Sequence, residues 1–368
     1  MIRRGVRAAI AAAALSMPVA AAAQVTPAAG YTPPDDTQAI RIGAVIFWDY
    51  TFQNQPKVTD AGGNSVKLNA FDVKRTYINV TGNISHVVSF RITPDISPDN
   101  TTGSSLLGSR LFRLKYGYVN LALDDWMWRG SYVRLGQQQT LFIDSQEGVY
   151  RYRWQGTVFA ERDGGLSSSD FGAVFRTQFK GNYGDVAVGV YNGEGYSRTE
   201  PNNQKAVELR GTVRPLPNAN GILRNLRFTG FMHQDSVFKD AERNRYLFSA
   251  MVEHRRFNAN FDWLAKQDQT SATAAEVDGD GWSFFVTPFF KEKGNGLEAL
   301  IRYDSLRPNK DVTDGRQNRW IAGLAYWFPH PGGNATAAVM LDYEQVTFNN
   351  IANQPKQQRV FVHGLINF

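Results

Sequence analysis

The chain has 368 residues, no cysteine and a formal net charge of +6. Without cysteine it can form neither a disulfide framework nor a thiolate metal site. Its mean hydropathy of −0.37 excludes a helical membrane protein but leaves open a β-barrel, in which only alternate residues face lipid.

The N-terminal residues have the order of a secretory signal. Arg3, Arg4 and Arg7 precede an apolar stretch from Ala8 to Ala20, and Ala21-Ala22-Ala23 supplies the small residues of a cleavage site. We therefore predict a signal peptide over residues 1–23. Its apolar stretch is too short for a membrane-spanning helix. Losing these three arginines halves the formal charge of +6, and a charge so balanced does not indicate a nucleic-acid partner.

Residues 24–39 contain Pro27, Pro33 and Pro34 among small polar residues. This composition predicts an extended periplasmic leader without a core of its own. The barrel domain is expected over residues 40–368.

From residue 40 onward the chain becomes a series of segments about ten residues long with period-two alternation, the pattern of a transmembrane barrel. In the first segment Ile42, Ile46 and Trp48 share one parity, whereas Arg41 and Asp49 share the other. Sixteen such segments are expected, at residues 40–52, 71–83, 87–96, 110–123, 131–140, 169–179, 184–192, 205–214, 226–234, 244–255, 257–267, 279–290, 297–306, 318–328, 335–346 and 357–368. We therefore predict an all-β, 16-stranded antiparallel transmembrane β-barrel.

The connections between these segments tend to alternate in length. Long ones such as 53–70 and 141–168 are separated by short ones such as 84–86 and 180–183, as expected for long external loops and short periplasmic turns. The last segment ends in Phe368, in a pattern that resembles the C-terminal assembly signal of outer-membrane barrels. The alternative is a secreted β-sandwich or solenoid whose final strand ends in phenylalanine by chance.

Short motifs in a fixed order are spread over almost the whole expected mature chain. They are Phe71-Asp72-Val73-Lys74-Arg75, Val133-Arg134-Leu135-Gly136-Gln137, Phe159-Ala160-Glu161-Arg162, Asp170-Phe171-Gly172, Val190-Tyr191-Asn192-Gly193, Asn203-Gln204-Lys205 and Leu209-Arg210 with Pro215. In this order the chain resembles the phosphate-selective porin O and P family of Gram-negative outer membranes. The resemblance implies a 16-stranded barrel, usually a homotrimer, whose third external loop folds inward to narrow the pore.

The chain departs from that family in its lysines. Members with phosphate specificity carry lysines and an arginine ladder along the pore, but this chain has no lysine between Lys115 and Lys180. Arginine binds phosphate in a bidentate manner, so the expectation of anion preference does not depend on lysine.

The less apolar parity of each segment is expected to face the lumen. In the first half of the chain it carries a basic stripe of Arg41, Arg75, Arg91, Arg113, Lys115, Arg134, Arg176, Arg210 and Arg214. In the second half, basic residues including Arg227, Arg255 and Arg302 stand beside an acidic wall of Glu298, Asp304, Asp342 and Glu344. A basic stripe in a low-dielectric wall would raise the local concentration of anions. Alternatively, these arginines only brace the wall by pairing with carboxylates.

The connection from Leu141 to Ser168 is the longest and contains Tyr150-Arg151-Tyr152-Arg153-Trp154 and Glu161-Arg162. We expect an extended stretch there, with the rings against the barrel wall and Arg151, Arg153, Arg162 and Glu161 at the pore constriction. The alternative is that these aromatic and arginine residues form a contact between barrels.

Catalytic and metal-binding patterns are weak. His233, Asp235 and Ser236 are close in sequence, but neighbouring side chains on a strand alternate faces. The histidines show no metal-ligand spacing, and Asp278-Gly279-Asp280-Gly281 lacks the remaining ligands of a calcium loop. We therefore predict no catalytic residue, no metal and no cofactor.

The sequence thus predicts a porin in the outer membrane of a Gram-negative bacterium, in contact with lipid and passing small anions such as phosphate. A general or sugar-type diffusion porin is the first alternative. An outer-membrane barrel enzyme is the second and weaker one.

Overall fold

The computed structural model describes residues 36–236, 238–329 and 335–368, so the expected signal peptide and the leader up to residue 35 lie outside the described residues. The described residues form sixteen strands, two α-helices and two 3-10 helices. These are β1 (Ala39–Thr59), β2 (Ser65–Asn83), β3 (Val88–Pro98), β4 (Arg110–Ala122), β5 (Tyr132–Gln139), α1 (Leu141–Tyr150), α2 (Phe159–Arg162), β6 (Ser169–Gln178), η1 (Lys180–Asn182), β7 (Gly184–Tyr191), β8 (Ala206–Val213), η2 (Gly221–Asn225), β9 (Leu226–Gln234), β10 (Arg243–His254), β11 (Phe257–Asp268), β12 (Val277–Pro288), β13 (Gly296–Arg307), β14 (Arg316–Trp327), β15 (Thr336–Asn349) and β16 (Gln357–Asn367).

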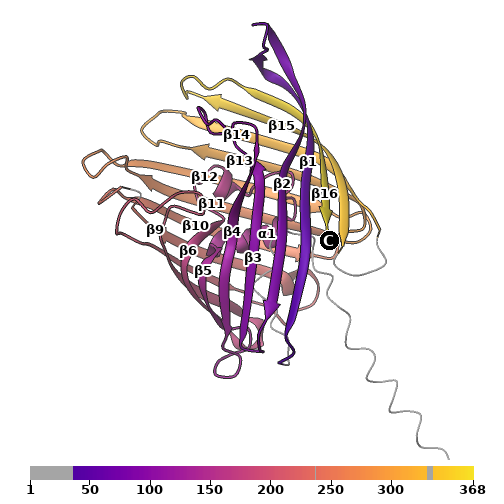
Figure 1. Cartoon of the computed structure of the whole chain (residues 1–368), viewed down its shortest axis with the longest axis vertical. Helices are drawn as coiled ribbons and strands as arrows, with labels where there is room; N and C mark the ends of the chain where they lie inside the picture. The colour runs from indigo at the N-terminus through magenta and orange to yellow at the C-terminus, as the bar shows by residue number, and fades with distance from the viewer. Residues whose placement is uncertain (1–35, 237, 330–334) are drawn as a thin grey trace, which may run out of the picture.

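The strands form one closed antiparallel sheet. Each strand pairs with the next in sequence, and β16 pairs back with β1 (Figure 1). At this seam Val45 lies opposite Asn367 and Phe52 opposite Val360. Ala44 and Phe368 exchange backbone hydrogen bonds of 3.0 and 2.9 Å. The predicted fold class and number of strands are therefore confirmed.

The parity of each strand separates an apolar outer face from a polar inner face. Ile42 is 70% exposed and Phe71 82% exposed on the outside, whereas Asp49 on β1 and Asp95 on β3 are buried inside. An apolar outer face removes the need to desolvate charges in a bilayer, and the closed ladder leaves no unpaired sheet edge there. None of the helices in the described part of the chain has the length and apolar character that crossing a membrane requires.

Aromatic side chains form a row on the outer face of β11 to β14. The ring centroids of Phe261 and Trp282 are 6.4 Å apart, those of Trp282 and Tyr303 are 5.0 Å apart, and those of Tyr303 and Trp320 are 4.6 Å apart. Trp320 is half exposed. Such rows of aromatic residues mark the interface between a bilayer and water.

The first hairpin is longer than expected. The ladder between β1 and β2 continues to the pair Thr59–Ser65, and Figure 1 shows this hairpin projecting beyond the rest of the barrel. Asp60 closes its turn by accepting hydrogen bonds from the backbone N–H groups of Gly62 and Asn64, at 2.9 and 2.8 Å. The prediction of a long loop over 53–70 was wrong. It relied on apolar alternation to identify strands, but two strands can pair through their backbones without an apolar face.

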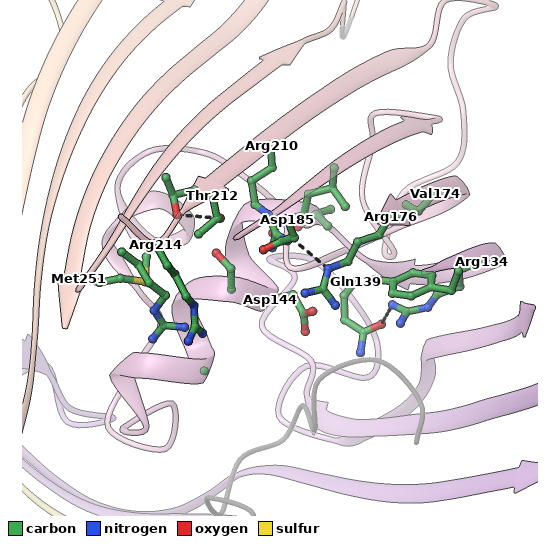
Figure 2. A pocket seen from close by; sticks show the side chains of 17 residues that line it. Arg134, Gln139, Asp144, Val174, Arg176, Asp185, Arg210, Thr212, Arg214 and Met251 are labelled. Atoms are coloured by element: carbon green, nitrogen blue, oxygen red, sulfur yellow. Dashed lines mark hydrogen bonds and ion pairs between the residues drawn. The ribbon is translucent and has the colours of Figure 1, made fainter. Parts of the chain in front are cut away.

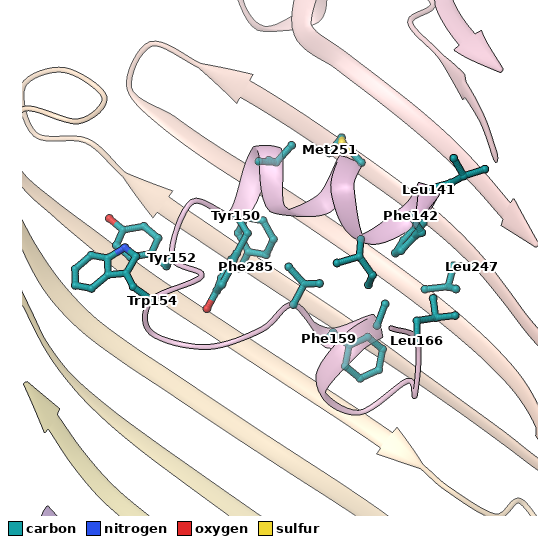
Figure 3. Close-up of a cluster of buried hydrophobic side chains, with 14 of the residues drawn as sticks. Leu141, Phe142, Tyr150, Tyr152, Trp154, Phe159, Leu166, Leu247, Met251 and Phe285 are labelled. Atoms are coloured by element: carbon teal, nitrogen blue, oxygen red, sulfur yellow. The ribbon is translucent and has the colours of Figure 1, made fainter. Parts of the chain in front are cut away.

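The long connection between β5 and β6 lies inside the barrel. Phe142 of α1 packs on Phe231 of β9 with ring centroids 5.1 Å apart, and Tyr150 packs on Phe285 of β12 at the same distance. Tyr152 and Trp154 pack edge-on against Trp327 of β14. These contacts form the core of the molecule (Figure 3). The rings lie against the inner wall, as expected, and not on an outer surface available to another barrel.

The conformation of this connection differs from the expected extended stretch. A helix runs to Tyr150, and Arg151 then adopts a left-handed conformation with φ of 63°. Leu141, Phe142 and Val149 are buried against the wall, so the inner surface of the barrel provides the apolar contacts that hold a short helix. Arg151 and Arg153 consequently do not share one side of an extended chain.

Arg151 anchors the connection to the opposite wall. Its Nη1 donates to both carboxylate oxygens of Glu298 on β13, at 3.1 and 3.0 Å, and the Tyr152 hydroxyl donates to Glu298 at 2.6 Å. The guanidinium lies over the rings of Trp327 and Phe289, at 4.6 and 5.2 Å from their centroids. Only 1% of Arg151 is exposed, so this ion pair is shielded from solvent.

We predict that assembly requires the terminal aromatic residue. Phe368 is 77% exposed, so its ring contributes little packing to the folded barrel and is available to an assembly factor. Deleting Phe368 should lower the fraction of heat-modifiable barrel in the outer membrane, whereas Phe368→Trp should preserve it. Normal insertion of the deletion variant would show that the residue is no assembly signal.

We also predict that Arg151→Ala releases the connection from the wall. Removing one partner of a buried ion pair leaves a charge uncompensated, which costs about 3–5 kcal/mol. Tryptic cleavage at Arg153 and Arg162 in the folded barrel should become faster. The double variant Arg151→Met/Glu298→Gln removes both charges and should regain most of the protection. Wild-type protection in Arg151→Ala would mean that the ion pair does not anchor the connection.

Candidate functional site

The basic residues expected in the lumen lie on the inner face of the barrel. Arg75, Arg91, Arg113, Arg134, Arg176 and Arg210 have this orientation by their register with neighbouring strands, and Lys115 has it as the fully buried residue of a bulge. Arg41 shares the inner parity but is exposed near one end of β1. Arg255 was also expected inside, but it lies in the exposed turn between β10 and β11 because β10 ends at His254.

One group of basic residues surrounds Asp95. Arg75 and Arg113 both pair with this buried carboxylate, at 2.5 and 3.0 Å. The same two guanidinium groups donate to the hydroxyl of Tyr196, at 3.1 and 3.2 Å. Tyr196 belongs to the connection between β7 and β8, so a second connection reaches into the barrel. The sequence analysis did not identify this contact.

Lys115 is buried beside this group. A bulge between β3 and β4 separates the pairs Thr93–Tyr116 and Pro94–Leu114, which turns both Lys115 and Tyr116 inward. The Lys115 ammonium lies 5.2 to 5.8 Å from the ring centroids of Tyr77, Tyr116 and Tyr196. Cation–π attraction thus replaces part of the solvation that burial removes.

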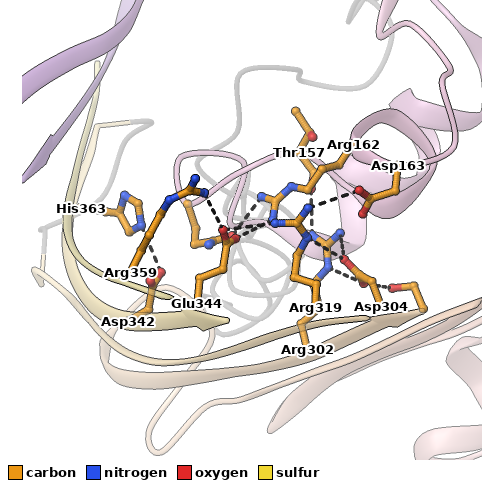
Figure 4. A network of polar contacts seen from close by, with 12 residues as sticks. Thr157, Arg162, Asp163, Arg302, Asp304, Arg319, Asp342, Glu344, Arg359 and His363 are labelled. Atoms are coloured by element: carbon orange, nitrogen blue, oxygen red, sulfur yellow. Dashed lines mark hydrogen bonds and ion pairs between the residues drawn. The ribbon is translucent and has the colours of Figure 1, made fainter. Parts of the chain in front are cut away.

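Arg162 of the long connection contacts the acidic wall (Figure 4). Arg162 pairs with Glu344 at 3.0 Å, and Arg319 of β14 joins Asp163 and Glu344 at 3.2 and 3.1 Å. Asp304 pairs with Arg302 at 2.7 Å. Together with Arg151 and Glu298, these contacts pair the arginines of the long connection and of β13 and β14 with the carboxylates of β13 and β15 on one side of the lumen.

Arg153 is held within the connection itself. It pairs with Glu147 of α1 at 2.7 Å and with Glu161 of α2 at 3.6 Å. Burial raises the pKa of Glu161, but the attraction of Arg153 and then of Lys115 outweighs it and sets the pKa below the usual value. Arg151, Arg153 and Arg162, which were expected at the pore constriction, therefore face carboxylates in this structure.

A buried histidine joins the acidic wall to the seam of the barrel. His363 of β16 lies between Asp49 of β1, at 2.6 Å, and Asp342 of β15, at 3.0 Å. Lys74 also pairs with Asp49, and Trp154 stands edge-on to the His363 ring. Asp342, expected as part of an open acidic wall, is thus enclosed by contacts that hold the first and last strands together.

A cavity inside the barrel lies between α1 and the wall formed by β5 to β10, and has a volume of about 190 Å³. Five arginines line it from successive strands and their ends (Figure 2). They are Arg134, Arg176, Arg210, Arg214 and Arg227. Two carboxylates, Asp144 and Asp185, line it as well. We call this group the arginine cavity.

Arg134 is the most rigidly held of these arginines. The rings of Tyr118 and Tyr132 cover its guanidinium, at 4.4 and 4.7 Å from the ring centroids, and its Nη1 donates to Gln139 at 2.9 Å. Its buried Nε and Nη2 have no hydrogen-bond partner among the described residues. The guanidinium is thus fixed in orientation and retains donors for an oxygen-bearing ligand.

The other arginines of the cavity differ in how far they are neutralised. Arg176 and Arg210 share Asp185, which Arg176 contacts at 3.0 Å. Arg227 pairs with Glu253, which lies outside the cavity lining. Arg214 forms no side-chain hydrogen bond or ion pair with any described residue. Positive charge therefore exceeds negative charge in this space.

The two carboxylates of the cavity were missed by the sequence analysis for different reasons. Asp185 was identifiable, because Val186, Val188 and Val190 occupy the outer parity of β7 and leave Asp185 on the inner one. Asp144 was not, because it lies on α1, which the sequence did not predict. Among the described residues, no group of three or more possible ligands could hold a metal ion.

No protein-family model and no curated protein matches the sequence. Solved structures do match the fold. The anion-selective porin from Comamonas acidovorans has a TM-score of 0.58 and 10% identity, over 90% of this chain and 100% of the porin. A loop-deletion mutant of OmpT, an outer membrane protein of Vibrio cholerae, has a TM-score of 0.60 and 11% identity over the same shares of the two chains.

The outer membrane channel DcaP of Acinetobacter baumannii also matches, with a TM-score of 0.58 and 10% identity over 93% of this chain and 100% of the channel. At such low identity the likeness concerns the fold alone. The chain is therefore a β-barrel of the outer-membrane type, and it shares its fold with porins and channels of bacterial outer membranes.

Proposed function

We propose that this chain is a porin of the Gram-negative outer membrane whose channel allows passive diffusion of small anions, in particular phosphate or related oxyanions. The observation that supports this best is the arginine cavity. Five guanidinium groups face one another there with only two carboxylates. A low-dielectric wall focuses their field, so anions would be concentrated next to the helix that narrows the lumen.

The chemistry of the cavity suits oxyanions. Guanidinium groups donate paired hydrogen bonds that match the spacing of two phosphate oxygens. Arg134 has donors without a hydrogen-bond partner and Arg214 has no ion-pair partner in the described chain, so both can bind without first breaking an ion pair. Asp144 and Asp185 moderate the attraction, and a permeating ion must be able to leave as well as enter.

A general or sugar-type diffusion porin is the second candidate. Arg176 and Arg210 are neutralised by Asp185, and Arg302 by Asp304. Such pairing lowers the net charge that a permeating solute meets. The preference for anions over cations separates the two candidates. An anion porin should show such a preference, whereas a porin for neutral solutes does not need an excess of arginine in its channel.

Other parts of the proposal rest on the sequence pattern and the family resemblance. They are export by a signal peptide over residues 1–23, a leader over residues 24–39, membership of the phosphate-selective family and assembly into a homotrimer in contact with outer-membrane lipid. The proposed role is diffusion and involves no catalysis.

Replacing Arg134 and Arg214 by glutamine should lower the preference for anions. Neither arginine has an ion-pair partner among the described residues, so the double variant breaks no ion pair. Reversal potentials in planar bilayers under a KCl gradient should show anion preference for the wild type and a clear shift toward zero for the variant. Arg307→Gln, which changes an arginine paired with Asp280 near the end of β13, is the matched control. A wild-type potential that favours cations would contradict the proposal.

Phosphate should also compete with chloride in the same cavity. Added phosphate should reduce the chloride current of the wild type. In the Arg134→Gln/Arg214→Gln variant the half-blocking concentration should rise about tenfold or more, since a hydrogen bond to a charged group contributes about 1.5–3 kcal/mol. Equal block in the variant and in the Arg307→Gln control would place phosphate binding outside the arginine cavity.

A further inference from the structure

Asp144 is the one carboxylate of the arginine cavity that has no ion-pair partner in the described chain. It lies in the first turn of α1, and Figure 2 shows its carboxyl group beside Gln139, Arg176 and Asp185. Its Oδ1 is buried and has no hydrogen-bond partner among the described residues. Asp185, by contrast, is bound by both Arg176 and Arg210.

The charged and titratable groups that share the cavity with Asp144 come from β5 to β9. They are Tyr132 and Arg134 of β5, Arg176 of β6, Asp185 of β7, Arg210 and Arg214 at β8, and Arg227 of β9. The guanidinium groups of Arg134, Arg210 and Arg176 attract the Asp144 carboxylate, but none forms a direct ion pair with it. Arg91 of β3 also attracts the Asp144 carboxylate. Asp144 therefore presents a hydrogen-bond acceptor to a cavity in which nearly every other charged group is a donor.

The Asp144 carboxylate, as an acceptor among arginine donors, can distinguish an oxyanion that carries a proton from one that does not. Phosphate keeps at least one proton at neutral pH, so it can accept from the arginines and at the same time donate its O–H to a carboxylate. Sulfate has no proton to donate, and its oxygen atoms would face the carboxylate with like charge. A repulsive element of this kind confers specificity against the wrong ligand.

From this arrangement we propose that Asp144 makes the arginine cavity prefer oxyanions that carry a proton, such as phosphate, over oxyanions that do not, such as sulfate. The inference rests on the proposed function and assigns a specificity-determining residue to it. It depends on the unpartnered Asp144 oxygen, whereas the general preference for anions depends on the arginines.

Protonation of Asp144 should abolish this preference. Burial raises the pKa of Asp144 above the ordinary aspartate value, although Arg134, Arg210 and Arg176 oppose the shift. Above that pKa the carboxylate is ionised and repels sulfate. As the pH falls through it, the carboxyl group becomes a donor, so the ratio of sulfate block to phosphate block should rise.

The experiment measures the half-blocking concentrations of phosphate and of sulfate on the chloride current of the full-length barrel at neutral pH. The wild type should need about tenfold more sulfate than phosphate, since a hydrogen bond to a charged group contributes at least that factor. Asp144→Asn should bring the two values close together, because an amide can donate to sulfate and does not repel it. Asp144→Glu should keep most of the preference.

Asp185→Asn is the matched control, because it neutralises a carboxylate in the same cavity that already forms ion pairs with Arg176 and Arg210 through its Oδ2. It should change phosphate and sulfate block by the same factor and leave their ratio unaltered. Heat-modifiability confirms folding of each variant. A wild type blocked equally by both anions, or an Asp144→Asn variant with the wild-type ratio, would overturn the role of Asp144. A wild type blocked by neither anion would instead overturn the proposed function.

Discussion

Closure of the sheet is the constraint on which the rest of the structure depends. In a bilayer every backbone N–H and C=O group needs a partner within the protein, and a sheet with a free edge cannot provide one. Pairing of β16 with β1 removes the edge, and the parity of each strand then divides the side chains between lipid and lumen. All the charge that the strands carry at membrane depth is consequently forced into one narrow space.

The charges in that space determine where the side chains of the long connection bind. Two of its arginines pair with carboxylates of the wall, Arg151 with Glu298 of β13 and Arg162 with Glu344 of β15. The acidic side of the lumen is thereby neutralised. The basic side, from β5 to β9, receives only Asp144 from the same connection. The connection thus creates an excess of positive charge opposite itself, without contributing an arginine to the cavity.

The comparison with known structures is consistent with this division of roles. Porins and channels share the barrel at 10 to 11% identity, because a barrel requires alternation, turns and closure and very few particular residues. The lumen is under different constraints, since most of its buried charges are paired with particular residues on other strands or on the long connection. Selectivity therefore has to be argued from residues such as Arg134, Arg214 and Asp144, and the fold by itself does not provide it.

The sequence by itself determined the barrel: the sixteen strands and the inward direction of Arg134 and Arg210. These features follow from period-two patterning, which acts between neighbours in the chain. Only the tertiary structure decided that α1 forms, that Arg151 pairs with Glu298, and that Asp144 remains without an ion-pair partner in the arginine cavity. Those outcomes depend on which side chains meet across a closed lumen, and partners more than a hundred residues apart leave no local pattern in the sequence.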